Sequence, residues 1–337
     1  MSFDVLKFEK DQLIFIDQTK LPDEEIYIST DNYERIAEAI ERLEIRGAPL
    51  IGIAALYALA LSTKKNSSEF EKAFQRLRKT RPTAVNLFTA LDSAKNFFYS
   101  AEENQNYKAL LDFAQKFHQN DKEYCDKIAQ NGAELINSFL NKSVRILTHC
   151  NTGALATGGI GTAFGVIVEL HKRNLVEIVY ACEARPLFQG LRLTSFELKK
   201  NEIRYKVITD STAAFLMQKG MVDVVIVGAD RIASNGDVAN KIGTYSLAVN
   251  AHYHSIPFYV AAPSTSVDKE IRSGEEIPVE ERKPEELLHF GNKKMISSEI
   301  EALNFAFDIT PNELVKGIIT EKKVYFPPFD FRNDKDS

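Results

Sequence analysis

Six short apolar runs rich in β-branched residues recur along the second half of the chain, and most are separated by stretches with helical spacing. The runs cover residues 144–149, 176–181, 205–209, 222–227, 257–261 and 317–319. Strands that alternate with helices form right-handed βαβ units, and such units build a parallel sheet with helices on both faces. The sequence therefore predicts a Rossmann-like domain, whose ligands bind beyond the carboxyl ends of the strands.

The first 130 residues follow a different pattern. Residues 1–30 alternate weakly between apolar and polar positions around a Leu21-Pro22-Asp23 turn, as a small β-meander would. Apolar residues then recur at helical spacing in most of the stretch up to residue 130. We therefore predict an α/β protein. Residues 1–130 form a mainly helical N-terminal domain with a small β-meander, and residues 131–330 form a Rossmann-like C-terminal domain with a parallel sheet.

The segment after the first predicted strand, residues 150–165, is rich in glycine. A strand, a glycine-rich turn and a helix together open many nucleotide- or phosphate-binding folds, in which backbone N–H groups face an anion. The glycines at 159, 161 and 165 depart from the dinucleotide fingerprint, because their spacing is one residue too long and they come late after the strand. An NAD-dependent oxidoreductase, which Glu183 also suggests, remains an alternative.

Composition excludes several classes of protein. The chain has 337 residues with 42 Lys and Arg against 47 Asp and Glu, and no long run of one sign indicates a nucleic-acid or membrane surface. Three cysteines without a C-x-x-C pair argue against a disulfide framework and indicate a reducing compartment. The longest apolar run, residues 50–61, is shorter than the roughly 20 residues that a membrane span needs. We expect a cytoplasmic protein with no nucleic-acid or membrane partner.

Metal and cofactor motifs are sparse. The six histidines give one close pair, His252 and His254, which has no acidic or cysteine companion nearby in sequence. A Walker loop and an ordered Ser-His-Asp arrangement are also missing from the sequence. We therefore expect no metal and no cofactor.

Two residues at predicted strand ends can do chemistry. Cys150 stands between a strand and the glycine-rich turn, where a nearby helix N-terminus would lower the pKa of a thiol; the alternative is a buried structural cysteine. Asp230 follows a strand and Gly228-Ala229, and it is either a capping residue or a proton donor. Apolar surroundings would raise the pKa of this carboxyl and let it donate a proton near neutral pH.

Three further segments could bind an anion. Arg46-Gly47-Ala48-Pro49 places backbone amides and a cation at the start of an apolar helix, although these four residues alone favour a plain helix–turn–helix with a solvated arginine. Arg81 lies in a polar break between two helices and has the same two explanations. Asn240 and Lys241 could grip sugar hydroxyls and a phosphate, or act as a cap beside a surface lysine.

Seven motifs in register resemble those of the methylthioribose-1-phosphate isomerases, a family related to the regulatory subunits of the eukaryotic exchange factor for translation initiation. The motifs are RGAP at 46–49, TRPTAVNL at 80–87, THCN at 148–151, QG at 189–190, GADRI at 228–232, NKIGT at 240–244 and IPVEER at 277–282. The resemblance runs from about residue 13 to Glu321, nearly the whole chain.

The resemblance implies a homodimeric aldose–ketose isomerase of methionine salvage. Such an enzyme converts 5-methylthioribose 1-phosphate to 5-methylthioribulose 1-phosphate without a metal or a nucleotide. Carried over position by position, the resemblance makes Cys150 and Asp230 catalytic. It assigns substrate binding to Arg46, Gly47, Ala48, Arg81, Gln189, Asn240 and Lys241.

The sequence also departs from the family pattern. It has no tryptophan, residues 304–308 read NFAFD where the family often has Asn-Pro-Ala-Phe-Asp, and residues 181–186 read ACEARP. These departures leave the substituent on C5 of the sugar open. The alternatives are a related sugar 1-phosphate, such as 5-deoxyribose 1-phosphate or ribose 1,5-bisphosphate, and a non-catalytic regulatory subunit like those of the initiation factor.

Overall fold

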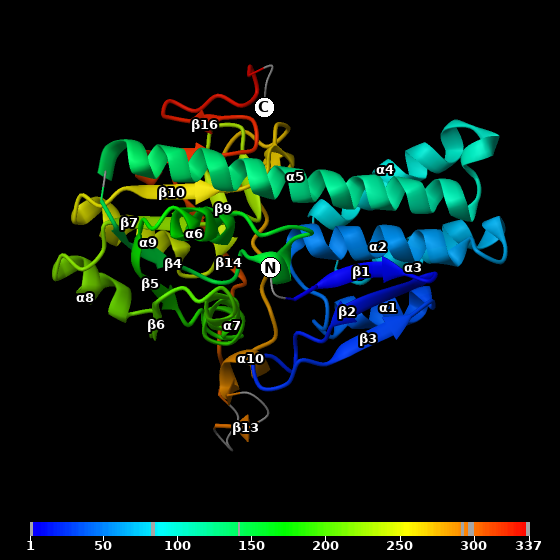
Figure 1. Cartoon of the computed structure of the whole chain (residues 1–337), viewed down its shortest axis with the longest axis horizontal. Helices are drawn as coiled ribbons and strands as arrows, with labels where there is room; N and C mark the ends of the chain where they lie inside the picture. Colours follow the sequence, from blue (N-terminus) through cyan, green and yellow to red (C-terminus); the bar gives the residue numbers. More distant parts are fainter. Residues whose placement is uncertain (1–2, 82–84, 141, 291–292, 296–299, 335–337) are drawn as a thin grey trace. The chain divides into compact units, whose positions relative to one another are not determined.

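The structure is a computed structural model that describes residues 3–81, 85–140, 142–290, 293–295 and 300–334 (Figure 1). The chain divides into two compact units. The first unit comprises Met1–Asp126 and Thr152–Gly161, and the second comprises Lys127–Asn151 and Thr162–Ser337. In the part of the chain that the structure describes, no helix has the length and apolar character needed to cross a bilayer.

A three-stranded antiparallel meander opens the first unit, as the sequence predicts. Its strands are β1 (Leu6–Glu9), β2 (Gln12–Ile16) and β3 (Tyr27–Thr30), in the order β1-β2-β3. Lys10 and Asp11 form the two-residue turn between β1 and β2 with φ values of 49° and 59°, the left-handed conformation that tight hairpins need. Leu13 and Phe15 of β2 are buried, so one face of the meander lies on the core.

The rest of the first unit is helical. Its helices are α1 (Tyr33–Glu41), α2 (Ala48–Ser62), α3 (Phe70–Arg78), α4 (Val85–Ser100) and the part of α5 (Tyr107–Leu140) up to Asp126, with short 3₁₀ helices η1 (Ser67–Glu69) and η2 (Glu102–Asn104). Helix α2 contacts α1, α3 and α4, and it is apolar on all sides, as a central helix must be. The helical spacing predicted up to residue 130 is thus confirmed, and its last part belongs to one helix of 34 residues, α5.

The central part of the glycine-rich segment, Thr152–Gly161, belongs to the first unit and contains a short 3₁₀ helix, η3 (Ala154–Ala156). A Cβ atom at Gly158 would lie 2.6 Å from the His118 side chain, and one at Gly159 would lie 2.9 Å from Cys125, both on α5. The Gly158 N–H already donates to the Asp121 carboxylate at 2.6 Å. Gly158 and Gly159 therefore serve close packing of the backbone, and a role of the segment in phosphate binding stays a prediction.

A seven-stranded sheet forms the centre of the second unit. Its strands are β4 (Val144–Thr148), β5 (Val176–Cys182), β6 (Tyr205–Ile208), β7 (Val224–Val227), β10 (Phe258–Ala261), β15 (Gly317–Ile319) and β16 (Val324–Tyr325). The order is β16-β15-β10-β7-β4-β5-β6, and all neighbours run parallel except β15 and β16. All six predicted strands are confirmed.

Helices cover both faces of this sheet, as the doubly wound prediction requires. Helices α8 (Thr212–Gln218) and α9 (Thr244–Tyr253) contribute to one core; α6 (Ala163–Lys172), α7 (Ser195–Lys200) and the second part of α5 contribute to the other. Side chains along β5 alternate between the two cores: Tyr180 and Cys182 face α8 and α9, whereas Val179 and Ala181 face α6.

A second, four-stranded sheet was not predicted. It consists of β8 (Arg231–Ala233), β9 (Val238–Lys241), β11 (Val267–Asp268) and β14 (Phe307–Thr310), in the order β11-β8-β9-β14. The smaller helical elements are a π-helical turn η4 (Gly190–Thr194), the 3₁₀ helices η5 (Ser264–Ser266), η6 (Gly274–Glu276) and η7 (Asn312–Leu314), and the short helix α10 (Glu285–Leu288). The strands β12 (His289–Phe290) and β13 (Lys293–Lys294) form a separate pair.

Candidate active site

Cys150 lies two residues beyond the end of β4, in a strained turn. Its φ of 61° is left-handed, a conformation that costs a residue other than glycine about 1–3 kcal/mol and is found most often at functional sites. The Thr194 hydroxyl donates a hydrogen bond to the Cys150 carbonyl, which fixes the turn. The residue is half-buried. The strand end thus holds the thiol in one defined position.

The β8–β9 hairpin brings Asp230 beside Asn240. Asp230 directly precedes β8, and its N–H donates to the Ala239 carbonyl at 2.9 Å. The antiparallel register pairs Arg231 with Ala239, so its continuation places Asp230 opposite Asn240 and next to Lys241. Asp230 and Asn240 can both be identified in the sequence, but only the hairpin shows that they are neighbours.

The pKa of Lys241 responds to the other charged groups of the candidate site. Its side chain is buried, and burial lowers the pKa of the ammonium group. The charges of Cys150, Glu286 and Asp230 raise that pKa, and the Arg282 cation lowers it. Cys150 and Asp230 therefore lie within electrostatic reach of one ammonium group. A buried cation of this kind favours the ionised forms of a nearby thiol and carboxyl.

The start of α9 fixes the loop that follows Lys241. Thr244 accepts a hydrogen bond from the Asn240 amide at 3.0 Å and donates to the Lys241 carbonyl at 2.6 Å. The N–H groups of Gly243 and Tyr245 donate to Asp308, at 2.7 and 3.1 Å, and burial raises the pKa of Asp308 to about 6. Asp308 thus holds the first amides of the helix, and Asn240 and Lys241 project from a strand rather than from a helix cap.

Gln189 lies where β5 leads into the π-helical turn. A Cβ atom at Gly190 would lie 1.7 Å from the Cys182 carbonyl oxygen, so only glycine fits beside Gln189. The Gln189 side-chain oxygen is buried, and it accepts no hydrogen bond from any residue that the structure describes. π-Helical turns are frequent at functional sites. This oxygen is available to a hydroxyl group of a ligand.

The other predicted binding residues, Arg46, Gly47, Ala48 and Arg81, belong to the first unit. Gly47 precedes α2 with a φ of 97°, and a Cβ atom there would lie 2.4 Å from the Ala156 Cα. The Arg46 guanidinium donates to the Gln18 side chain at 3.1 Å. Residues 82–84 of the motif around Arg81 lie outside the described residues. The binding role of these four residues stays a prediction.

Sequence reasoning missed two charged residues of the site. Arg282 donates from its Nε to both Glu286 oxygens, at 3.0 and 2.9 Å, and from another nitrogen to Glu280 at 3.0 Å. The charges of Arg282 and Glu286 act on Lys241. The available signal was the IPVEER motif, to which no role was given.

Comparison with known proteins identifies the family. Residues 44–327 match the model of the initiation factor 2 subunit family. A methylthioribose-1-phosphate isomerase from Caldicellulosiruptor saccharolyticus is 47% identical over 333 residues, which cover 96% of each chain. The chain belongs to the methylthioribose-1-phosphate isomerase family. The resemblance read from the sequence is thereby confirmed.

Solved structures agree with this membership of the isomerase family. The crystal structure of 5-methylthioribose 1-phosphate isomerase from Pyrococcus horikoshii OT3 has a TM-score of 0.90 at 42% identity, covering 98% of this chain and 94% of that one. The translation initiation factor eIF-2B, subunit delta, from A. fulgidus has a TM-score of 0.86 at 41% identity, covering 97% and 96%. Members of the isomerase fold family thus include proteins named as initiation factors.

Proposed function

We propose that this chain is an aldose–ketose isomerase that converts 5-methylthioribose 1-phosphate to 5-methylthioribulose 1-phosphate in methionine salvage. Near end-to-end identity of 47% with an enzyme of that name supports the reaction. The observation that carries the site assignment is the β8–β9 register, which places Asp230 opposite Asn240 and beside the buried Lys241. The charges of Cys150 and Asp230 raise the pKa of that lysine. We also propose that the enzyme is a cytoplasmic homodimer.

Ring opening is the first chemical problem. A phosphate on C1 locks the sugar as a cyclic acetal, so the ring must open before C1 and C2 can exchange oxidation states. In our proposal Asp230 binds a proton despite the Lys241 ammonium, which favours the carboxylate, and gives this proton to the ring oxygen as the bond from that oxygen to C1 breaks. General acid catalysis of this kind contributes roughly 10²–10⁴-fold to the rate.

Cys150 then acts as the base. Its thiolate removes the proton from C2, and the electron pair forms the C1–C2 double bond of a cis-enediol. The proton returns to C1 while the C2 hydroxyl gives its own proton to the Asp230 carboxylate, which leaves a carbonyl at C2 and restores the protonated Asp230. Lys241 supports this step because its ammonium group favours the thiolate. The competing route is a direct hydride shift from C2 to C1.

The remaining predicted residues bind the substrate in this proposal. The Gln189 side-chain oxygen, which has no hydrogen-bond partner among the described residues, accepts from a sugar hydroxyl. Asn240 binds a second hydroxyl, and Lys241 contributes a charge-assisted contact to the phosphate. The proposed binding residues for the sugar phosphate also include Arg46, Gly47, Ala48 and Arg81.

Isomerisation in heavy water tests the proposal. We expect the purified chain to convert 5-methylthioribose 1-phosphate to the ketose, with deuterium from the solvent on C1, as followed by proton and phosphorus NMR. A ketose that keeps only protium at C1 would overturn Cys150 as the base and support the hydride shift. No ketose at all would contradict the isomerase proposal and favour a regulatory subunit, the kind of protein that the A. fulgidus relative is named for.

A further inference from the structure

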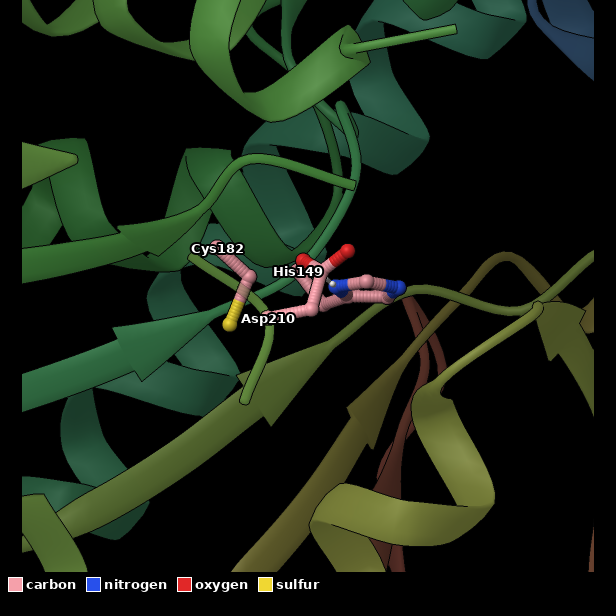
Figure 2. Close-up of side chains that lie close together, drawn as sticks. All are labelled: His149, Cys182 and Asp210. Carbon is pink, nitrogen blue, oxygen red and sulfur yellow. Dashed lines mark ion pairs between the residues drawn. The ribbon is translucent and has the colours of Figure 1, made fainter. Parts of the chain in front are cut away.

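Three donor side chains from neighbouring strands meet at the carboxyl edge of the seven-stranded sheet (Figure 2). His149 directly follows β4, Cys182 ends β5, and Asp210 comes two residues after β6. These three strands are adjacent in the sheet. The edge is the one at which parallel sheets bind their ligands.

Strand register explains why the three side chains share one face. Thr148 pairs with Ala181, so His149 is in register with Cys182. Cys182 pairs with Ile208 of β6, and Asp210 lies two residues further on. Side chains two residues apart lie on the same side of a strand, which here is the side of α8 and α9.

Hydrogen bonding fixes which nitrogen of His149 is available. The Nε2 atom lies 2.8 Å from the Ile242 carbonyl oxygen, which can only accept, so Nε2 carries a proton. In the neutral ring Nδ1 then presents a lone pair. The His149 side chain is 1% exposed, and among the described residues Nδ1 has no hydrogen-bond partner. Leaving such an atom unsatisfied costs about 1–3 kcal/mol.

The Asp210 carboxylate is held so that it faces this nitrogen. Its two oxygens accept from the backbone N–H groups of Ala184 and Arg185, at 2.8 and 2.9 Å. One of them, Oδ1, lies 3.9 Å from His149 Nδ1, too far for a hydrogen bond. A carboxylate and an imidazole lone pair at this distance repel each other unless a positive charge lies between them.

We propose that His149 Nδ1, Cys182 Sγ and Asp210 Oδ1 form a binding site for a divalent cation of the zinc class. Nitrogen, sulfur and oxygen ligands together are the set that zinc prefers. Bond lengths of about 2.0–2.3 Å in a tetrahedron place ligand atoms about 3.3–3.8 Å apart. The three donor atoms lie within 4.8 Å of one another, so small side-chain movements bring them to that spacing.

The site carries two carboxylates and has access to solvent. Glu183 and Asp210 both act on Cys182 as negative charges, while Lys241 acts on His149, and Arg185 on Glu183, as positive charges. The Asp210 side chain is 32% exposed, which provides an entry path to the otherwise buried donors. In our proposal the cation takes no part in the isomerase reaction, so a result that contradicts one of the two proposals leaves the other unchanged.

The first unit offers a matched contrast. His118, Asp121 and Cys125 also combine the three ligand types, but both ring nitrogens of His118 lie within hydrogen-bond distance of other groups. Nδ1 lies 3.1 Å from the Tyr57 hydroxyl, and Nε2 lies 3.2 Å from the Gly158 carbonyl oxygen. We therefore expect no cation there, and Cys125→Ser is the control for loss of a buried thiol.

Cobalt substitution tests the site on the full chain. We expect the reduced, metal-free protein to bind one Co²⁺ per chain with a sulfur-to-cobalt charge-transfer band, and Zn²⁺ to displace it. Cys182→Ser should abolish the band and weaken binding at least tenfold, and Asp210→Asn should weaken binding but keep the band. Cys125→Ser and Cys150→Ser should both keep the band. No band in the native chain, or a band that survives Cys182→Ser, would overturn the proposal.

X-ray absorption on the zinc-loaded native chain gives a test that needs no variant to fold. We expect one sulfur and two or more nitrogen or oxygen ligands around the metal. A coordination shell without sulfur, or with two sulfurs, contradicts the assignment.

Discussion

At the residue scale, the proposed chemistry depends on a thiol and a carboxyl that share one ammonium group. We predict that Cys150→Ala and Asp230→Asn each lower kcat at least ~10²-fold with little change in KM, because both groups act mainly in the transition state. Steady-state kinetics checks this, with Cys125→Ser as a control that removes a thiol of the first unit. Near-normal turnover in either variant removes that residue from the mechanism.

The sequence could predict some residues of the site and not others. Cys150 and Asp230 stand out because each follows an apolar run, and strand ends are where ligands bind in parallel sheets. The group of His149, Cys182 and Asp210 depends on the register of three strands, which no sequence pattern states. Their contact therefore became visible only in the structure.

At the element scale, the glycine-rich segment owes its composition to close packing. Gly161 has a φ of 98°, and a Cβ atom there would lie 2.4 Å from the Thr152 carbonyl oxygen. Gly220, which follows α8, also has a positive φ, 63°, but a Cβ atom there would meet nothing within 4 Å. The two glycines share a backbone constraint and differ in the space around them.

We predict that Gly161→Ala destabilises the fold much more than Gly220→Ala. The backbone conformation alone costs about 1 kcal/mol at either position. The clash at Gly161 should add at least about 2 kcal/mol, since a rigid backbone atom must move. Urea unfolding followed by circular dichroism measures both free energies. Equal losses in the two variants would show that close packing does not explain the glycine at 161.

The strength of the local sequence pattern explains which strands could be predicted. The strands β4, β5 and β7 are largely apolar, and helices lie between β4 and β5, between β5 and β6, and between β6 and β7, so the pattern indicates a parallel sheet. The four-stranded sheet has strands of two to four residues, and β9 ends in Asn240 and Lys241. Polar residues in so short a strand give no alternation, because tertiary pairing rather than local pattern defines the element.

At the scale of the whole molecule, we predict a homodimer from the family resemblance. Light scattering at micromolar concentration should give about twice the chain mass of 38.0 kDa. The same mass should persist across a dilution series within that range. A single species of 38.0 kDa contradicts this prediction and leaves the isomerase proposal untouched.

Substrate choice also belongs to the whole molecule. The predicted binding residues supply three cations, Arg46, Arg81 and Lys241, for the 1-phosphate and its surroundings. Arg282, the further cation that acts on Lys241, is already bonded to Glu280 and Glu286. A second phosphate on C5 has no evident partner among these groups, so an uncharged 5-substituent should be preferred.

The central claim is tested most directly by kcat/KM for three sugars measured in parallel: 5-methylthioribose 1-phosphate, 5-deoxyribose 1-phosphate and ribose 1,5-bisphosphate. We predict that 5-methylthioribose 1-phosphate is the best substrate. The 5-deoxy sugar should follow within a factor of roughly 10–200, because one small apolar group contributes about 1–3 kcal/mol. The bisphosphate should be the poorest. A clear preference for the bisphosphate, or no turnover of any of the three, would contradict the account.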